Sequence, residues 1–287
     1  MSIKVSVIVP VYNRLDELGL VLNSLVNQTL PLKDFEVCIG DDGSNTDVEG
    51  FLREFVNLHP GLNVCYARQE DLGFRVAAAR NLGMAQAIGE ILVFNDNGMA
   101  MASDVLEKHV VLHAQHGTNL VALANMHGTG WGTDGAIVRQ ALLDNAPDFD
   151  KAVASLKESN LVDGRISYIF ERKGYDINAY DSPWSALWGG HFSINAKFAK
   201  AHNIKWNEAF VGWGGEDNEL GIQLTDAGAN FQFFHDLNVV HYPTEGSLNL
   251  AVEDKAAFDK NYQRVKDLIR ALHPNNPVVQ AQYGAKA

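Results

Sequence analysis

Residues Val5–Arg14 read VSVIVPVYNR, and this stretch decides the fold of the chain. The run Lys4–Val9 is rich in Val and Ile and meets Pro10, which predicts a buried strand of a parallel sheet. Leu and Val then recur at helical spacing over Leu15–Val26, so a helix follows the strand directly. A strand followed at once by a helix is the beginning of a βαβ unit.

The same alternation continues through the first half of the chain. Further strands are predicted at Phe35–Ile39, Leu62–Ala67 and Glu90–Phe94, and further helices at Val48–Val56, at Arg75–Ala87 and from an N-cap at Ser103 to about His113. Right-handed crossovers between such strands give an α/β fold with a mostly parallel central sheet flanked by helices.

From Leu120 onward the pattern is less regular. Short strands are predicted at Leu120–Asn125, within Trp184–Ile194, at Phe231–Phe234 and at Leu237–His241. An amphipathic helix over Val252–Leu272 is expected to precede a frayed end. The character of the sequence changes near residue 118 without a linker, so we predict a single domain over residues 1–287.

The composition narrows the classes of function. A formal net charge of −12 without a Lys/Arg cluster argues against nucleic-acid binding, although a local basic patch for a polyanionic acceptor stays open. No stretch approaches the ~20 apolar residues of a membrane span, and no signal peptide is recognisable, so we expect a cytoplasmic protein. Cys38 and Cys65 lie in apolar runs and predict buried thiols rather than a disulfide or a metal site.

Polar residues follow several of the predicted strands. Tyr12, Asn13 and Arg14 come after the first strand, Asp41 and Asp42 after the second, and Asp96 after the fourth. Ligands bind at the carboxyl ends of the strands in open α/β sheets, so these side chains are the candidates for a binding site.

A second stretch, Gly212–Leu220, reads GWGGEDNEL and precedes apolar residues at helical spacing. Adjacent glycines allow the chain to turn sharply and to lie close to a ligand. Glu216 and Asp217 fall in the first turn of the expected helix, where the helix dipole favours negative charge, so helix capping is one interpretation. Trp213 favours a carbohydrate site instead, because sugars stack on flat aromatic surfaces.

Four segments in this order carry a resemblance to a known family: VSVIVPVYNR, IGDDGSNTD, GFRVAAARNLGMAQAIGEILVFND and GWGGEDNELGIQL. Over Val5–His241 the chain resembles a family 2 glycosyltransferase of the GT-A fold, which is a Rossmann-like α/β fold. The second half resembles the segment that galactosyltransferases share with polypeptide N-acetylgalactosaminyltransferases. The resemblance implies a nucleotide-binding half over residues 1–117, a donor-sugar and acceptor half over 118–250, and a carboxy-terminal helix and tail over 251–287.

The resemblance assigns the first half to a nucleotide-diphosphate sugar, and UDP is the expected nucleotide. Asp41 or Asp42 can accept the imide N–H of a uracil. The alternative is a simple Asp-Asp-Gly-Ser turn in which Asp42 caps the next helix. The segment expected around the base and ribose consists of Pro10, Val11, Tyr12, Asn13 and Arg14.

Two arginines lie in the Ala-rich segment that precedes the fourth strand. They could be solvated helix arginines, but a guanidinium buried against a sheet needs an anion, and a diphosphate supplies one. The family pattern assigns this segment to the donor. We therefore expect Arg75 at the phosphates, whereas Arg80, with Asn81, is expected to be structural.

The metal motif departs from the family pattern. The family places Asp-x-Asp after the fourth strand to hold Mg²⁺ or Mn²⁺, but here Asp96 stands at the first Asp and Gly98 at the second. An Asn97 carbonyl, phosphates and waters could complete the shell of a hard cation. His241 matches the metal-binding histidine of the related galactosyltransferases, although a lone His after a strand is more often structural. A second triplet, Asp148–Asp150, follows no strand and is interpreted as a chance match.

The resemblance places the catalytic base in the second half. In inverting relatives the second acid of the motif deprotonates the acceptor hydroxyl, and that position here is Asp217. Direct displacement by a hydroxyl needs such a base, because a hydroxyl is a poor nucleophile at neutral pH. Glu216 is expected to bind sugar or acceptor hydroxyls, and Trp213, with Gly214 and Gly215, to form the acceptor platform.

Further donor-sugar contacts are expected from a segment ahead of one predicted strand. Its residues are Trp184, Trp188, Gly189, Gly190 and His191. For the two tryptophans and the Gly-Gly-His run, packing in the core is an equally open interpretation.

These expectations amount to an inverting glycosyltransferase that uses UDP-hexose or UDP-N-acetylhexosamine, with Mn²⁺ or Mg²⁺ as a cofactor that the missing second Asp puts in question. A retaining transferase or a nucleotide-sugar hydrolase would use the same donor site. A catalytically weakened sugar-nucleotide-binding protein is a third alternative. Neither the hydroxyl acceptor nor the oligomeric state follows from the sequence.

Overall fold

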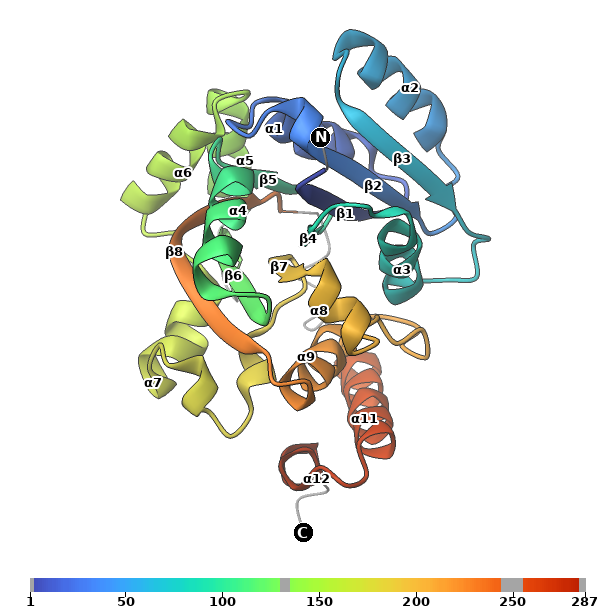
Figure 1. The fold of residues 1–287 in the computed structure, drawn as a ribbon, viewed down its shortest axis with the longest axis vertical. Coiled ribbons are helices and arrows are strands. Elements are labelled where there is room, and N and C mark those ends of the chain that lie inside the picture. The colour runs from blue at the N-terminus through green and yellow to red at the C-terminus, as the bar shows by residue number, and fades with distance from the viewer. Residues whose placement is uncertain (1–2, 130–134, 244–254, 284–287) are drawn as a thin grey trace.

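The computed structural model describes residues 3–129, 135–243 and 255–283. An eight-stranded sheet in the order β3-β2-β1-β4-β7-β6-β8-β5 runs through the molecule, with helices packed around it (Figure 1). The strands are β1 (Val5–Val11), β2 (Phe35–Asp41), β3 (Asn63–Arg68), β4 (Ile91–Asn95), β5 (Met99–Met101), β6 (Leu120–His127), β7 (His191–Asn195) and β8 (Asn230–His241).

Helices precede or follow most of these strands. They are α1 (Leu15–Val26), α2 (Val48–Leu58), α3 (Val76–Gln86), α4 (Val105–His116), α5 (Gly135–Asn145), α6 (Phe149–Glu158), α7 (Glu171–Lys173), α8 (Ala196–Ala201), α9 (Glu216–Asp226), α11 (Lys255–Leu272) and α12 (Pro277–Tyr283). Short helical turns lie at Leu32–Asp34, Ile166–Phe170, Ile177–Ala179 and Pro183–Ala186. The predicted mostly parallel α/β sheet flanked by helices is confirmed.

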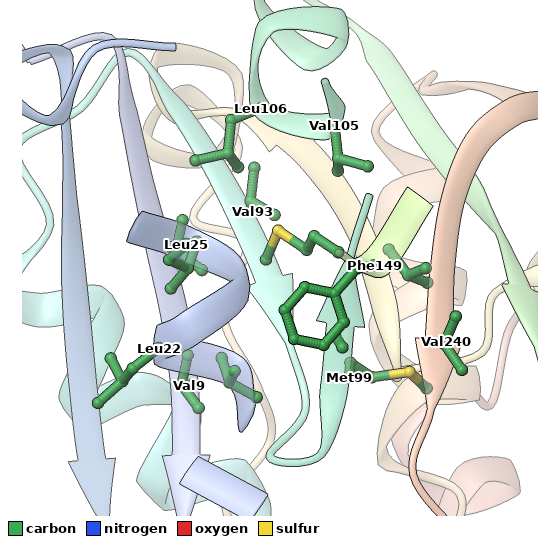
Figure 2. Packing of buried hydrophobic residues seen from close by; sticks show 14 of the residues in the cluster. Val9, Leu22, Leu25, Val93, Met99, Val105, Leu106, Phe149 and Val240 are labelled. Carbon is green, nitrogen blue, oxygen red and sulfur yellow. The ribbon is translucent and has the colours of Figure 1, made fainter. Parts of the chain in front are cut away.

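Strand β1 lies at the centre of the parallel half of the sheet and is buried on both faces. Val7 and Val9 point into one hydrophobic cluster, which α1, α4, α5 and α6 complete, while Ile8 points into a second cluster with α3, α8 and α9. Figure 2 shows part of the first cluster, to which Leu22 of α1, Phe149 of α6 and Val240 of β8 all contribute. Burial on both faces explains why this segment reads as a continuous β-branched run.

The parallel pairings bring three strand ends to one edge of the sheet. Val11 pairs with Asp41, and Ile8 of β1 pairs with Phe94 of β4, so β1, β2 and β4 end side by side. Pro10 lies beyond the last residue of β1 that pairs with β4, so its missing N–H breaks no bond on that side.

Strand β7 runs antiparallel to β4 and places a distant segment beside this edge. His191 pairs with Asn95, and the N–H of Asp96 donates to the carbonyl oxygen of Gly190 over 2.9 Å. The Gly189-Gly190 turn therefore lies next to the end of β4.

Several of the predicted elements differ in detail from the structure. Strand β5 was not predicted, and Phe231–His241 forms part of a single strand, because a bulge in the pairing with β6 between Ala124 and Asn125 keeps it continuous. Ser103 is not the N-cap of α4; that position is Asp104, and the Ser103 hydroxyl donates to Asp150 over 2.6 Å.

The tail also differs from the prediction of a frayed end. Residues Pro277–Tyr283 form α12, and Val279 and Tyr283 are buried against α9 and α11 in a third hydrophobic cluster. Figure 1 shows α11 and α12 packed beside α9. The first three residues of the predicted helix Val252–Leu272 lie outside the described residues.

Both cysteines are free; Cys38 is buried and Cys65 half-buried, on the paired strands β2 and β3. Their donor atoms and those of Glu36 lie within 4.8 Å of one another. Burial raises the pKa of each thiol, and the Glu36 carboxylate already accepts from Ser6 Oγ and the N–H of Ile88, so protonated thiols are favoured over metal-bound thiolates. None of the helices in the described ranges combines the length and apolar character that crossing a membrane requires.

Candidate active site

The loops after β1 and β2 are joined by side-chain hydrogen bonds. The N–H of Asn13 donates to Ser44 Oγ, and Asn13 Oδ1 accepts from the N–H groups of Asn45 and Thr46. Asn13 and Arg14 have φ values of 61° and 34°, in the left-handed region that asparagine adopts more readily than most residues. These contacts hold the residues that follow β1 against the loop that carries Asp41 and Asp42.

The two adjacent aspartates have different surroundings. Asp41 is fully buried; its Oδ1 accepts from the N–H and hydroxyl of Ser44, and its Oδ2 accepts from the Tyr66 hydroxyl over 2.7 Å. Asp42 accepts from Gln69 Nε2 and from the N–H of Arg75 over 2.6 Å. Asp41 therefore holds the loop after β2 through Ser44 and Tyr66, whereas Asp42, which is also buried, joins this loop to the N-terminal end of α3.

Arg75 is the N-cap of α3. The predicted helix begins at Arg75, and the observed helix begins one residue later, at Val76. Its Nε lies 3.8 Å from Asp42 Oδ1, and its guanidinium also donates to the carbonyl oxygen of Glu70. Tyr12 is exposed, and its hydroxyl donates to Asp71 over 3.0 Å; this hydrogen bond raises the pKa of Tyr12. The residues predicted around the nucleotide are thus brought together at one edge of the sheet.

Arg80 joins the two halves of the chain. It is buried, with its guanidinium 4.2 Å from the ring centre of Trp206, and it donates to Asp96 Oδ1 over 2.6 Å and to Glu216 Oε1 over 3.0 Å. Burial alone would lower the pKa of Arg80, but the two carboxylates outweigh it and raise that pKa. The structural role predicted for Arg80 understated these contacts, since it connects the end of β4 to the start of α9.

The turn Gly189-Gly190 passes between these charged groups. A Cβ at Gly189 would lie 3.0 Å from Arg80 Nη2, and a Cβ at Gly190 would lie 2.5 Å from Met99 Cε. The N–H of Gly189 donates to Asp217 Oδ2 over 3.3 Å. A side chain at either position would have to displace Arg80 or Met99, so the two glycines let the turn lie close to both while the N–H of Gly189 reaches Asp217.

Asp217 and Glu216 begin α9, as predicted. Asp217 Oδ1 accepts from the N–H of Asn218 over 2.7 Å. Burial and, after it, the charge of Glu216 raise the pKa of Asp217 to about 7, against the opposing effects of Asn218 and Arg80. Glu216 Oε2 is buried and has no hydrogen-bond partner among the described residues. The pair therefore offers one carboxylate poised to take up a proton near neutral pH and one oxygen free to accept a hydroxyl.

The turn ahead of α9 depends on three glycines in the left-handed region. Gly212, Gly214 and Gly215 have φ values of 92°, 89° and 92°. The N–H of Gly212 donates to the carbonyl oxygen of Phe74 over 2.8 Å, and Trp213 is 55% exposed. The turn thus holds a large aromatic surface at the outside of the molecule, immediately before the two carboxylates.

Replacing Gly215 with Ala should lower the free energy of unfolding by about 3 kcal/mol, because a left-handed non-glycine residue costs roughly 1–2 kcal/mol and overpacking about 1–3. A Cβ at Gly215 would overlap Val265 Cγ1 of α11. Gly214→Ala is the matched control, since its φ is similar and a Cβ there meets nothing within 4 Å. Urea unfolding of both variants should show the larger loss for Gly215; equal losses would contradict the predicted overlap.

Three predicted donor-sugar residues make their observed contacts with other parts of the chain. Trp184 is 1% exposed and packs with Phe210 and Val265 in the third hydrophobic cluster. His191 is fully buried between Asn95 Oδ1, at 2.6 Å, and His109 Nε2, at 2.9 Å. Trp188 is half-buried, 5.7 Å from the Arg165 guanidinium. This burial favours the packing interpretation for Trp184 and His191, which the sequence left equally open.

The predicted cation ligands lie near one another at the ends of β4 and β8. The charge of Asp96 acts on His241, whose pKa is lowered by burial and partly restored by Asp96. Asn97 Nδ2 donates to the carbonyl oxygen of Arg14, while Asn97 Oδ1 is buried without a partner among the described residues. A carboxylate, an imidazole and an unpaired amide oxygen are donors that suit Mn²⁺, and the oxygens suit Mg²⁺, so the residues present fit such a cation.

Comparison with known proteins agrees with this arrangement. Residues 6–164, more than half of the chain, match the family described as Glycosyl transferase family 2. The chain belongs to this family. Residues 173–244 match a second family, described as the N-terminal domain of galactosyltransferase, which confirms the resemblance of the second half.

Two relatives show how far the similarity of this family 2 chain extends. Validoxylamine A glucosyltransferase of Streptomyces hygroscopicus subsp. jinggangensis is 32% identical over 222 residues, which are 76% of this chain and 50% of the relative. Chondroitin synthase of Escherichia coli is 29% identical over 264 residues, 89% of this chain and 37% of the relative. This chain therefore spans half or less of the length of these relatives.

Solved structures share the fold of this family 2 chain. S. aureus TarS 1–349 in complex with UDP superposes with a TM-score of 0.62 and 20% identity, over 95% of this chain and 66% of that one. Mannosyltransferase PcManGT from Pyrobaculum calidifontis, in complex with GDP-Man and Mn²⁺, superposes with a TM-score of 0.60 and 16% identity, over 99% and 70%. The predicted GT-A fold is confirmed.

Proposed function

We propose that this chain transfers a sugar from a UDP-hexose or UDP-N-acetylhexosamine to an acceptor hydroxyl with inversion, using Asp217 as the general base. The observation that carries the proposal is the position of Asp217 at the start of α9. Its carboxylate has a pKa of about 7 and accepts from the N–H of Gly189, beside the Arg80 bridge to Asp96. A carboxylate with that pKa is half deprotonated at neutral pH and can still bind a proton.

In the proposed reaction Asp217 takes the proton of the acceptor hydroxyl while the acceptor oxygen forms a bond to the anomeric carbon. The bond from that carbon to the diphosphate oxygen breaks, and its electron pair leaves on the diphosphate. The free Oε2 of Glu216 accepts a sugar or acceptor hydroxyl, and the exposed ring of Trp213 supports the acceptor.

The donor is held at the edge formed by β1, β2 and β4. Asp42 accepts the imide N–H of the base, the segment Pro10–Arg14 surrounds the base and ribose, and Arg75 pairs with the diphosphate. The names of relatives support a sugar nucleotide as donor, since they include a glucosyltransferase, chondroitin synthase and hyaluronan synthase. TarS has also been solved with UDP-GlcNAc.

Asp96 and His241 would hold a divalent cation at the diphosphate. When bound, Mn²⁺ or Mg²⁺ would offset negative charge on the departing diphosphate. The chain itself holds Asp96 in position. Arg80 donates to the Asp96 carboxylate, and the N–H of Asp96 donates to the carbonyl oxygen of Gly190, so the carboxylate keeps one orientation.

A screen of nucleotide sugars by thermal unfolding, with and without Mn²⁺, tests the donor class. A true donor at 100 times its dissociation constant should stabilise the chain by about 2.7 kcal/mol. The configuration of the product at the anomeric carbon, followed by NMR, then separates inversion from retention or hydrolysis. A chain that no sugar nucleotide stabilises would contradict the proposal.

The rate of transfer should rise with pH through about 7, because only deprotonated Asp217 can accept the hydroxyl proton. For a single group, kcat/KM at pH 6 is then roughly one-tenth of its plateau above pH 8. Glu216→Gln removes the neighbouring negative charge and should shift this rise to lower pH, whatever it does to the plateau. Initial rates between pH 5 and 9 check both points; a rate that falls between pH 6 and 8 would exclude the assigned base.

A further inference from the structure

We propose that Glu17 of α1 supplies the second carboxylate of the cation site, in place of the side chain that Gly98 lacks. The inference rests on the proposed function, because the cation is the one expected at the donor diphosphate. It concerns a residue that lies 81 positions before Gly98 in the sequence and that no local motif connects to it.

The first argument is the position of the Glu17 carboxylate. A Cβ built on Gly98 would lie 3.3 Å from Glu17 Oε2 and 3.7 Å from Glu17 Cδ. The carboxylate of Glu17 therefore occupies the space into which a side chain at position 98 would extend. The loop after β4 has no carboxylate at position 98, and the carboxylate of Glu17, from the first turn of α1, lies in its place.

The second argument is the surroundings of that carboxylate. The side chain of Glu17 is 12% exposed, and Arg14 Nη1 lies 3.2 Å from its Oε1 and 3.5 Å from its Oε2. Arg14 itself is half exposed, in the left-handed turn between β1 and α1. A largely buried carboxylate that is paired with one half-exposed arginine keeps lone pairs available for a cation.

The third argument is the set of donors beside it. Asn97 Oδ1 is buried without a partner among the described residues, and its Nδ2 donates to the carbonyl oxygen of Arg14, three residues before Glu17. The N–H of Tyr242, next to His241, donates to the carbonyl oxygen of Gly98 over 2.8 Å. The loop of Asp96–Gly98, the first turn of α1 and the end of β8 thus converge from three directions.

These donors do not enclose a cation by themselves. Among the described residues, one group of three possible ligands has its donor atoms within 4.8 Å of one another. It consists of Glu36, Cys38 and Cys65, which lie on β2 and β3 and not at this site. Mg²⁺ bound with nucleotides commonly takes one or two carboxylates and completes its shell with phosphate oxygens and water. Glu17 and Asp96 supply those two carboxylates, so the expected complex forms with the metal and UDP together.

Binding of Mn²⁺ in the presence of saturating UDP, followed by the EPR signal of free Mn²⁺, tests this role without measuring activity. Glu17→Gln should weaken Mn²⁺ binding on the order of tenfold or more, because one charged ligand is lost. Asp16→Asn is the matched control, since it removes the same charge from an exposed residue in the same helical turn, and it should leave the affinity within about twofold.

A second measurement separates ligation from a role in positioning Arg14. In EDTA, UDP should bind Glu17→Gln within about twofold of the unchanged chain, because the metal ligand is not used there. Mn²⁺ binding by Glu17→Gln equal to that of Asp16→Asn would overturn the inference. The inference would also be overturned if Glu17→Gln lost as much affinity for UDP in EDTA as it loses for Mn²⁺, because Glu17 would then serve to hold Arg14. An unchanged chain that binds no UDP under either condition would instead refute the proposed function.

Discussion

Asp217→Asn should reduce sugar transfer by about 10²–10⁴-fold, the range expected when a positioned base is removed, while the affinity for UDP stays nearly unchanged. Asn has the shape of Asp but cannot accept the acceptor proton. It keeps one oxygen for either the N–H of Gly189 or that of Asn218, so the start of α9 loses one hydrogen bond. The base and phosphates of the donor are expected at a different set of residues, at the ends of β1 and β2.

Initial rates at saturating donor and calorimetry with UDP measure the two effects separately. Asp226→Asn is a suitable control, because Asp226 ends the same helix and its side chain is 53% exposed. The control should retain full activity. An Asp217→Asn chain that transfers sugar at the original rate would reject Asp217 as the base, and one that loses UDP binding would assign it to the donor instead.

The first half of the fold follows from local patterns in the sequence. The β-branched run before Pro10 is the pattern of a buried strand, and the leucines after it have the spacing of an amphipathic helix. Both elements form, and α1 has the predicted bounds. Strand β5 has three residues and is defined by its pairing with β8. Such a short strand has no periodicity of its own, so its long-range partner decides it. Long-range contacts also decide α12, because Val279 and Tyr283 pack against residues of α9 and α11.

The candidate site was predictable where residues follow a strand and less so where a contact joins distant segments. Asp42 and Asp96 were expected at the edge from the order of the strands alone. Arg80 contacts Glu216 across 136 positions, and no spacing rule indicates that pair. One signal was present: a guanidinium in an Ala-rich helix packed on a sheet needs an anion, and carboxylates of this chain, besides a phosphate, can supply it.

The tryptophans show a different limit of sequence interpretation. Trp184 and Trp213 are both large aromatic residues near glycines, yet one is 1% and the other 55% exposed. A Cβ at Gly221 of α9 would lie 2.6 Å from Trp184 Cβ, so this tryptophan packs into the helix that carries the carboxylates. Trp184 is buried because α9, α11 and α12 cover it, whereas Trp213 lies in the turn before α9 and stays exposed; these tertiary contacts are not encoded in the local sequence.

Arg80→Met should lower the free energy of unfolding by about 3–5 kcal/mol, because removing one partner of a buried ion pair leaves the other charge uncompensated. The Glu216 side chain is 10% exposed and would lose its cation entirely, whereas Asp96, at 33%, can turn toward water. Met keeps much of the apolar volume over Trp206, so lost packing contributes little. Urea unfolding at pH 7 and 25 °C measures the change.

The double variant Arg80→Met/Glu216→Gln separates charge from volume. If the loss comes from an uncompensated carboxylate, neutralising Glu216 should restore part of the stability that Arg80→Met removes. Arg75→Met is the control for a cation at the N-terminal end of α3; its ion pair is longer, at 3.8 Å, and its side chain is more exposed, so a smaller loss of stability is expected than for Arg80→Met.

Arg80 also acts on the proposed base, which gives the prediction a second readout. Its positive charge opposes the rise in the pKa of Asp217 that burial and Glu216 cause. In the folded Arg80→Met chain the pKa of Asp217 should therefore lie above 7, and the rise of the rate with pH should move to higher pH. A stability loss with an unmoved pH profile would leave Arg80 as a purely structural bridge, and a shift to lower pH would contradict the assigned electrostatics.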